Sequence, residues 1–318
     1  MRDLKFSVIF TLAFIIGLTT LAFAIILDIL GIASPLGILF LAIVFNIGQW
    51  LISPYIIQAF YGVRELSYSE APQVHEVFDR LVSKAGFREK PKLMIAELPY
   101  PNAFAYGSPL TGNRVAITRG LLETLNLDEI EAVLGHELGH LVHKDVQIMT
   151  FASVIPAFFY LLSRLTFYSS LGDGDRDTGA IVVVGILSLI LYFILSLATL
   201  HLSRLREYYA DSYSVKLAPD PQTGARRLMS ALAKIVSSMG SMKARGYNLK
   251  VMGFKELFIA DPDTALKEYQ QLEGYTLAQR LLQKDVTLAD KIMELFSTHP
   301  NIVERLKFLD SIAKNNSL

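Results

Sequence analysis

The sequence predicts a mostly α-helical integral membrane protein with four transmembrane helices and a small β-sheet. Composition is the first observation: the 318 residues are 52% hydrophobic with a mean hydropathy of +0.38, too apolar for an ordinary soluble domain. The second is the presence of four long uncharged stretches. The third is a remainder of about 200 residues, enough for one soluble domain that contains the sheet.

The four uncharged stretches have the length needed to cross about 30 Å of hydrocarbon. The first runs from Phe6 to Leu27, the second occupies about 37 to 58, and the fourth runs from Ala180 to Leu200. The third, Val146 to Ser163, is the shortest, and a buried core helix is its alternative interpretation. The predicted domains are two transmembrane helices (1–63), a polar segment (64–145), two transmembrane helices with a short outer loop (146–202) and a second polar segment (203–318).

Basic residues predict the orientation in the membrane. They flank the spans on one side: Arg2, Lys5, Arg64, Lys144, Arg204 and Arg206. The loop between the third and fourth spans, GDGDRDTG, has one arginine among three aspartates. The positive-inside rule therefore places both termini and both polar segments in the cytoplasm. We expect a multi-pass protein of the cell membrane, in contact with the lipid bilayer.

Charge and cysteine content exclude several classes of protein. Acidic and basic residues are equal in number, at 30 each, and no basic arm suggests a nucleic-acid partner. The chain has no cysteine, which excludes disulfides and thiolate metal sites. Any metal must be held by nitrogen and oxygen. The sequence makes no prediction about an oligomer.

The first polar segment predicts a helix at 72–86, three short strands and a second helix. The strand patterns are KLMIAE, NAFAYG and RVAIT. Asn126 is a good N-cap for the second helix, and Glu129 completes a capping-box pattern. The second polar segment is mostly helical by periodicity.

The second of these helices carries the motif HELGH, residues 136–140. His136 and His140 are one turn apart and project from one face, so two imidazoles can bind one zinc ion. Glu137 is adjacent and can act as general base on a zinc-bound water. The neighbouring residues are uncharged, and burying these side chains without partners would cost several kcal/mol. We therefore favour a metal site over a structural helix. Gly139 costs about 1 kcal/mol against alanine, which predicts close approach of another element or of the substrate.

A third ligand is expected because catalytic zinc uses three protein ligands and one open position. A metzincin-type third histidine is excluded, since Val146 occupies that position. The stretch SRLREYYAD offers Glu207 as ligand and Asp211, on the same helix face, as acceptor from the other ring N–H of a ligating histidine. The alternative is a solvated face in which Arg204 and Arg206 pair with these carboxylates. The helical rise predicts a site about 10 Å above the cytoplasmic membrane surface.

The chain resembles the HtpX-type membrane zinc metalloproteases of peptidase family M48, a group that includes the Ste24-type CAAX-prenyl proteases. The motifs that carry the resemblance are PNAFAYG (101–107), HELGH (136–140), EYYAD (207–211) and THPN…R (298–305). The resemblance implies a gluzincin-like zinc protease domain that binds one Zn²⁺ through His136, His140 and Glu207, with Glu137 as base. It also implies polypeptide substrates, and a role in the quality control of misfolded or damaged membrane proteins.

Further residues are predicted from the remaining motifs. Asn102, Ala103 and Phe104 lie on a strand that could pair with an extended substrate; an ordinary core strand is the alternative. His299 is a candidate catalytic residue, and Arg305 could stabilise an oxyanion or orient a partner. A helix-start histidine and a surface arginine are the alternatives for these two. Tyr208 is another candidate donor.

Two other functions remain possible on the sequence alone. One is a CAAX-prenyl-type protease, although the Ste24 branch has more membrane spans than the four predicted here. The other is a non-enzymatic membrane sensor stabilised by its metal, in which His299 would close the site as a fourth ligand.

Overall fold

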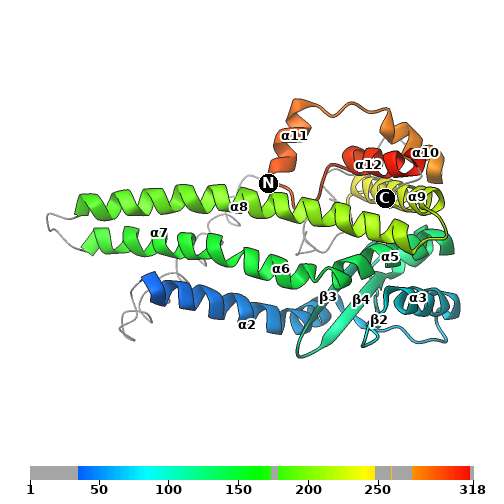
Figure 1. The fold of residues 1–318 in the computed structure, drawn as a ribbon, viewed down its shortest axis with the longest axis horizontal. Helices are drawn as coiled ribbons and strands as arrows, with labels where there is room; N and C mark the ends of the chain where they lie inside the picture. Colours follow the sequence, from blue (N-terminus) through cyan, green and yellow to red (C-terminus); the bar gives the residue numbers. More distant parts are fainter. Residues whose placement is uncertain (1–34, 173–177, 248–258, 260–273, 316–318) are drawn as a thin grey trace. The chain divides into compact units, whose positions relative to one another are not determined.

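The computed structural model describes residues 35–172, 178–247, 259 and 274–315. The chain is mostly helical with one small mixed sheet, as the sequence predicts (Figure 1). In the described part of the chain, three helical segments are long and apolar enough to cross a membrane: Leu39–Tyr61, Asp145–Tyr168 and Ile181–Leu217. They correspond to the second, third and fourth predicted spans. The first predicted span, Phe6 to Leu27, lies outside the described residues.

These segments differ in detail from the prediction. The third span comprises two helices, α6 (Asp145–Ala152) and α7 (Val154–Gly172), which break at Ser153. The fourth is part of one continuous helix, α8 (Thr178–Leu217), which runs past the predicted domain boundary at 202. Helix propensity does not fall where hydropathy falls, because residues 201–217 include neither glycine nor proline.

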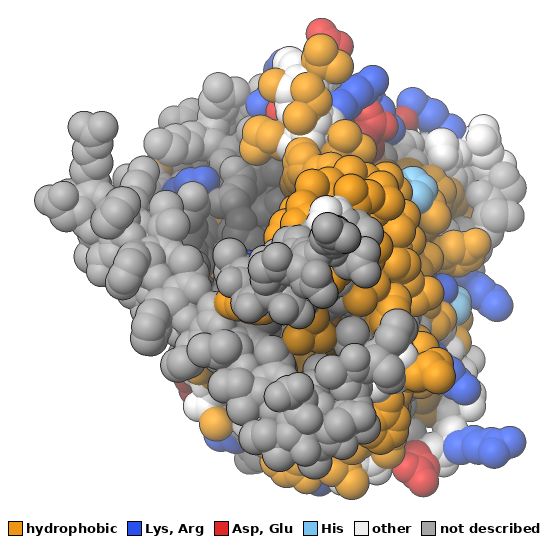
Figure 2. Space-filling model, turned by 90° about the vertical axis from the view of Figure 1, so that its left-hand side faces the viewer, with side chains coloured by type: hydrophobic (Ala, Val, Ile, Leu, Met, Phe, Trp, Pro, Cys, Tyr) orange, Lys and Arg blue, Asp and Glu red, His pale blue; other side chains and the backbone are white. Residues whose placement is uncertain are grey.

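The chain forms two compact units. The first comprises the described parts of Met1–Gln49 and Thr150–Thr199. In it, Gly185 of α8 admits Thr166 of α7 so closely that an added Cβ would lie 2.7 Å from the threonine hydroxyl. Small residues at helix contacts are typical of membrane helices. Hydrophobic side chains dominate much of the described surface in Figure 2, as expected for helices exposed to lipid.

The second unit comprises Trp50–Met149 and the described parts of Leu200–Leu318. Its sheet has the order β1-β2-β4-β3. The bounds are β1 Arg64–Glu65, β2 Lys92–Ala96, β3 Ala103–Ser108 and β4 Gly112–Thr118. The last three are the predicted strands, and β1 is a two-residue addition that the pattern does not predict. β2 and β4 are parallel, and the other two pairs are antiparallel, so β3 forms one edge.

Alternation along the strands gives the sheet two buried faces. One face contributes Leu93, Ile95, Val115 and Ile117 to the main core, together with α3 (Pro72–Ala85) and α5 (Leu127–Val142). The opposite face, which includes Met94, Phe104 and Tyr106, packs on Ile57 and Tyr61 near the end of α2 (Pro35–Tyr61). The edge strand is therefore packed on both faces, and in the described part of the chain its outer backbone edge pairs with no further strand.

The second unit contains further helices. They are α4 (Arg119–Thr124), α9 (Pro221–Ala244), α10 (Gly274–Leu282), α11 (Leu288–Leu295) and α12 (Ile302–Asn315). Helix α9 packs on α5, α10 and α12 (Figure 1). The predicted capping box is present, because Asn126 Oδ1 accepts from the Glu129 N–H and the Glu129 carboxylate accepts from the Asn126 N–H. Glu129 also accepts hydrogen bonds from Ser230 and Lys234 of α9, which fixes the start of α5.

Candidate metal centre

Two helices approach closely enough to form one site. Helix α5 carries His136 and His140, and α8 carries Glu207 and Asp211. Gly139 makes the approach possible: an added Cβ would lie 3.1 Å from both Ala210 Cα and Tyr213 Cβ. The neighbouring element that Gly139 admits is therefore α8.

Substituting Gly139 by alanine is expected to weaken Zn²⁺ binding by about 5- to 100-fold, because overpacking costs about 1–3 kcal/mol and separates the two ligand-bearing helices. The measurement is a zinc competition titration against a chromophoric chelator, with protein in detergent. Gly48→Ala is the matched control, because Gly48 lies in α2 with no atom within 4 Å of an added Cβ. Equal zinc affinity in the two variants would show that this helix contact does not set the site.

Three side chains converge as one ligand group. His136 Nε2 and His140 Nε2 lie 3.1 Å apart. The Glu207 carboxylate oxygens lie 3.6 Å from His136 Nε2 and 3.5 Å from His140 Nε2. Ligands about 2.05 Å from a tetrahedral zinc lie roughly 3.3 Å from one another, so the donor set and its spacing fit such an ion.

Each histidine is oriented by a carboxylate on its other ring nitrogen. His136 Nδ1 lies 2.9 Å from Asp211 Oδ1, and His140 Nδ1 lies 2.7 Å from Asp145 Oδ2. These contacts turn both Nε2 atoms toward Glu207 and fix the tautomers that a metal needs. Asp211 was predicted for this position, whereas the sequence pattern does not predict Asp145.

Each carboxylate is in turn held by an arginine. Arg305 of α12 donates to both oxygens of Asp211, at 3.0 and 2.6 Å. Arg206 of α8 donates to Asp145, and also to the His143 carbonyl at 2.8 Å. Lys144, at φ 57°, makes the sharp turn between α5 and α6 that returns Asp145 to His140. The first acidic residue after the second histidine, five positions on, is the sequence signal that could have identified Asp145.

Burial and charge set the protonation of the site. Burial raises the pKa of Glu137, although both neighbouring histidines lower it. Burial alone would lower the pKa of His140, but Asp145, Glu207 and Glu137 outweigh it and raise that pKa to about 9. In the metal-free protein His140 therefore holds a proton near neutral pH, which a metal ion must displace.

The other predicted residues lie around the same group. His299 is buried with Nδ1 3.4 Å from Glu207 Oε1. Arg305 is 1% exposed and lies 3.1 Å from Glu207 Oε2 as well as against Asp211, so it is not a surface arginine. The Tyr208 ring packs edge-on against Phe308 of α12, with 5.0 Å between centroids.

Arg204 is a further buried residue that the sequence pattern does not assign to the site. Its guanidinium donates to the carbonyls of Glu294 and Ser297, at 2.7 and 2.9 Å. These bonds fix the end of α11 and the turn that leads to His299.

The predicted substrate residues lie on and beside β3. Asn102 is buried, and its side-chain carbonyl accepts from the Ile259 N–H at 3.0 Å. The Ile259 carbonyl in turn accepts from Arg305 at 2.5 Å, which links Asn102 to the metal centre. Phe104 is buried against Tyr61, and Ala103 begins the edge strand. The structure also brings in Ala105, whose backbone N–H donates to the Glu137 carboxylate.

Known proteins resemble this chain over most of its length. Residues 68–313 match the model of peptidase family M48. A curated relative from Aeropyrum pernix, named as a protease HtpX homolog, is 39% identical over 89% of this chain and 87% of the relative. A second HtpX homolog, from Saccharolobus solfataricus, is 34% identical over 94% of this chain and 95% of the relative.

A solved structure shares the fold. The crystal structure of Ste24p from S. mikatae superposes with a TM-score of 0.58 at 20% sequence identity, and it covers 95% of this chain. This chain spans 64% of the Ste24p chain. The extent of the family and relative matches shows that this chain belongs to peptidase family M48 and, with its candidate membrane helices, is a membrane metalloprotease.

Proposed function

We propose that this protein is a zinc endopeptidase that cleaves misfolded or damaged membrane proteins at the cytoplasmic face of the cell membrane. One observation carries the zinc assignment: two imidazoles and a carboxylate converge at tetrahedral spacing beside a buried glutamate. His136, His140 and Glu207 would hold the ion. Bound zinc supplies Lewis acidity that polarises a peptide carbonyl and lowers the pKa of a coordinated water to about 7.

Glu137 would transfer the proton during peptide hydrolysis. Its carboxylate follows a ligating histidine on α5 and is 3% exposed, so it lies inside the site and is not itself one of the three grouped ligands. It accepts the proton of the attacking water and returns it to the leaving amine. Burial raises its pKa from the ordinary value, which brings an acid of this kind closer to the working pH and favours both transfers.

The outer edge of β3 is the proposed substrate-binding surface. The Asn102 carbonyl accepts from the Thr118 N–H at 2.9 Å, so by alternation Phe104 and Tyr106 also turn their backbone groups toward β4. Ala103 and Ala105 therefore turn theirs outward. The hydrogen bond from Ala105 to Glu137 supports this direction. An extended peptide would pair with Ala103 and with the Ala105 carbonyl, next to the metal.

The membrane location and the class of substrate are supported by different observations. Three described helices can cross a membrane, and the positive-inside pattern favours a cytoplasmic site. The likeness to protease HtpX homologs favours polypeptide substrates. The membrane-spanning segments favour substrates in the same membrane. A CAAX-prenyl activity is less well supported, since the Ste24p likeness is one of fold and that chain is considerably longer.

Zinc removal and return tests the proposal. Protein purified in detergent with a chelator is expected to leave an unfolded model protein intact, and stoichiometric Zn²⁺ is expected to restore its cleavage. Product masses would identify internal cuts. Tight zinc binding without cleavage of any unfolded or membrane protein would instead favour the metal-stabilised sensor.

A further inference from the structure

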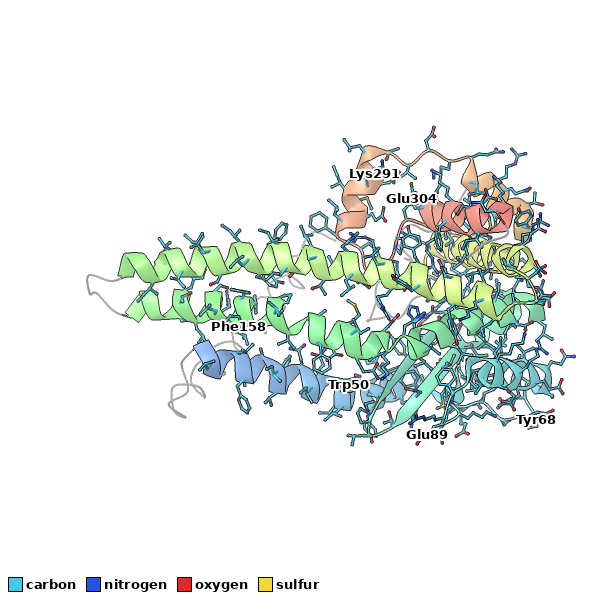
Figure 3. All side chains as sticks on the ribbon, in the orientation of Figure 1. Trp50, Tyr68, Glu89, Phe158, Lys291 and Glu304 are labelled. Atoms are coloured by element: carbon cyan, nitrogen blue, oxygen red, sulfur yellow. The ribbon has the colours of Figure 1, made fainter. Side chains whose placement is uncertain are left out.

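The single tryptophan of the chain, Trp50, bonds a main-chain group of the edge strand through its side chain. Trp50 lies on α2 beside the β3–β4 hairpin (Figure 3), and its indole Nε1–H donates to the Gly107 carbonyl at 3.1 Å. Gly107 follows Ala105 by two residues, so its backbone carbonyl belongs to the same outer edge. The indole therefore occupies an acceptor that a pairing peptide would use.

The other contacts between α2 and this hairpin do not involve the outer edge. Gln58 Nε2 donates to the Tyr106 hydroxyl at 3.4 Å, and the Tyr61 ring packs on Phe104. Ser108 Oγ donates to the Leu51 carbonyl at 3.3 Å. These contacts attach the helix to the side chains of β3 or to its end. Trp50 differs because it fills a main-chain position of the proposed substrate-binding edge.

Occupied acceptors limit how far a strand can extend. A paired strand would lie about 4.8 Å from β3, in the space where the indole makes its hydrogen bond. Pairing can therefore use the backbone groups of Ala103 and the carbonyl of Ala105, whose N–H is bound to Glu137, but must end at Gly107. Pairing would end here because of a side chain and not because of a bulge or a turn in the backbone. A single substitution of Trp50 can therefore remove the obstacle.

We propose that Trp50 ends the substrate-binding edge of β3 and so limits the number of substrate residues recognised on one side of the scissile bond. The inference rests on the proposed peptidase function and on pairing at β3. Trp50 is thus a specificity-determining residue of the peptidase reaction.

Peptides of increasing length test whether Trp50 ends substrate pairing along β3. A cleaved site from the unfolded model protein would be extended one residue at a time at either end, and kcat/KM measured for each peptide with zinc-loaded protein. For wild type, kcat/KM is expected to stop rising at a fixed length on one side. In Trp50→Leu, which removes the donor and the ring, the rise is expected to continue by about two residues and about 2- to 10-fold, the worth of one hydrogen bond.

Ser108→Ala is the matched control. It removes another bond of the same helix–strand junction but leaves the Gly107 carbonyl bound to Trp50. Its limiting length is expected to equal that of wild type. Gly107 itself is not a useful target, because an added Cβ would lie 2.5 Å from the Gly112 carbonyl oxygen.

Fluorescence gives a second readout that does not require a stable Trp50 variant. In zinc-loaded Glu137→Gln protein, emission from the single tryptophan is expected to change only with peptides that reach the limiting length. An identical limit in wild type and Trp50→Leu, or a shifted limit in Ser108→Ala, would overturn the stop while leaving the peptidase intact. Failure of wild type to cut any peptide would instead refute the proposed function, and the inference with it.

Discussion

Glu137→Gln is expected to lower kcat/KM for peptide hydrolysis by at least about 10²- to 10⁴-fold, the usual contribution of a positioned general base. Glutamine has nearly the same shape but cannot accept the proton of the attacking water. The side chain is buried, interacts electrostatically with both histidines and accepts from the Ala105 N–H, so the substitution changes chemistry more than packing. Zinc content is expected to be retained, because Glu137 is outside the ligand group.

The measurement pairs cleavage rates with metal analysis of the same samples. Glu123→Gln, on the exposed side of α4, is the matched control and is expected to cleave as wild type does. A Glu137→Gln protein that binds one zinc and keeps its full rate would remove Glu137 from the mechanism. Loss of both zinc and activity would assign it a ligand-positioning role instead.

Arg305→Met is expected to destabilise the metal-free protein by about 3–5 kcal/mol, because it removes one partner from a buried charge cluster. The guanidinium is 1% exposed and contacts the carboxylates of Asp211 and Glu207. Burial alone would lower the pKa of Arg305. The two carboxylates outweigh burial and raise this pKa above its ordinary value. Methionine fills a similar volume and leaves two buried anions without their cation.

Zinc should reduce this penalty, because the ion neutralises Glu207 even when Arg305 is absent. The expected result is therefore a large fall in thermal midpoint without metal and a smaller fall with it. Zinc affinity is expected to drop about 10- to 100-fold, since Asp211 no longer holds His136 firmly. The exposed Arg280→Met is the control. Equal midpoints for Arg305→Met and wild type in the metal-free state would contradict the electrostatic role.

The local geometry of a helix is what allowed the sequence to predict the candidate metal centre. His136 and His140, like Glu207 and Asp211, are four residues apart, and that spacing places each pair on one helix face. The capping box at Asn126 was predictable for the same reason, since its bonds join residues three apart. Hydropathy was equally informative about the second, third and fourth membrane spans, each of which overlaps a described apolar helical segment.

Features that depend on tertiary contacts were not predictable. Asp145 reaches His140 only because Lys144 adopts a left-handed conformation, and Arg206 reaches Asp145 only because α8 packs on α5. The outward direction of Ala105 depends on the register of β3 against β4. In a hairpin this register follows from the type and length of the turn, which the strand patterns alone do not specify.

The two arginine–carboxylate–histidine chains draw on distant parts of the sequence. One joins α5 to α8 and α12, and the other joins α5 to α6 and α8. During synthesis the ribosome delivers α12 long after α5, so a nascent chain holds the HELGH motif without the arginine that fixes Asp211. We therefore expect peptide cleavage by this chain only after α12 has emerged and docked.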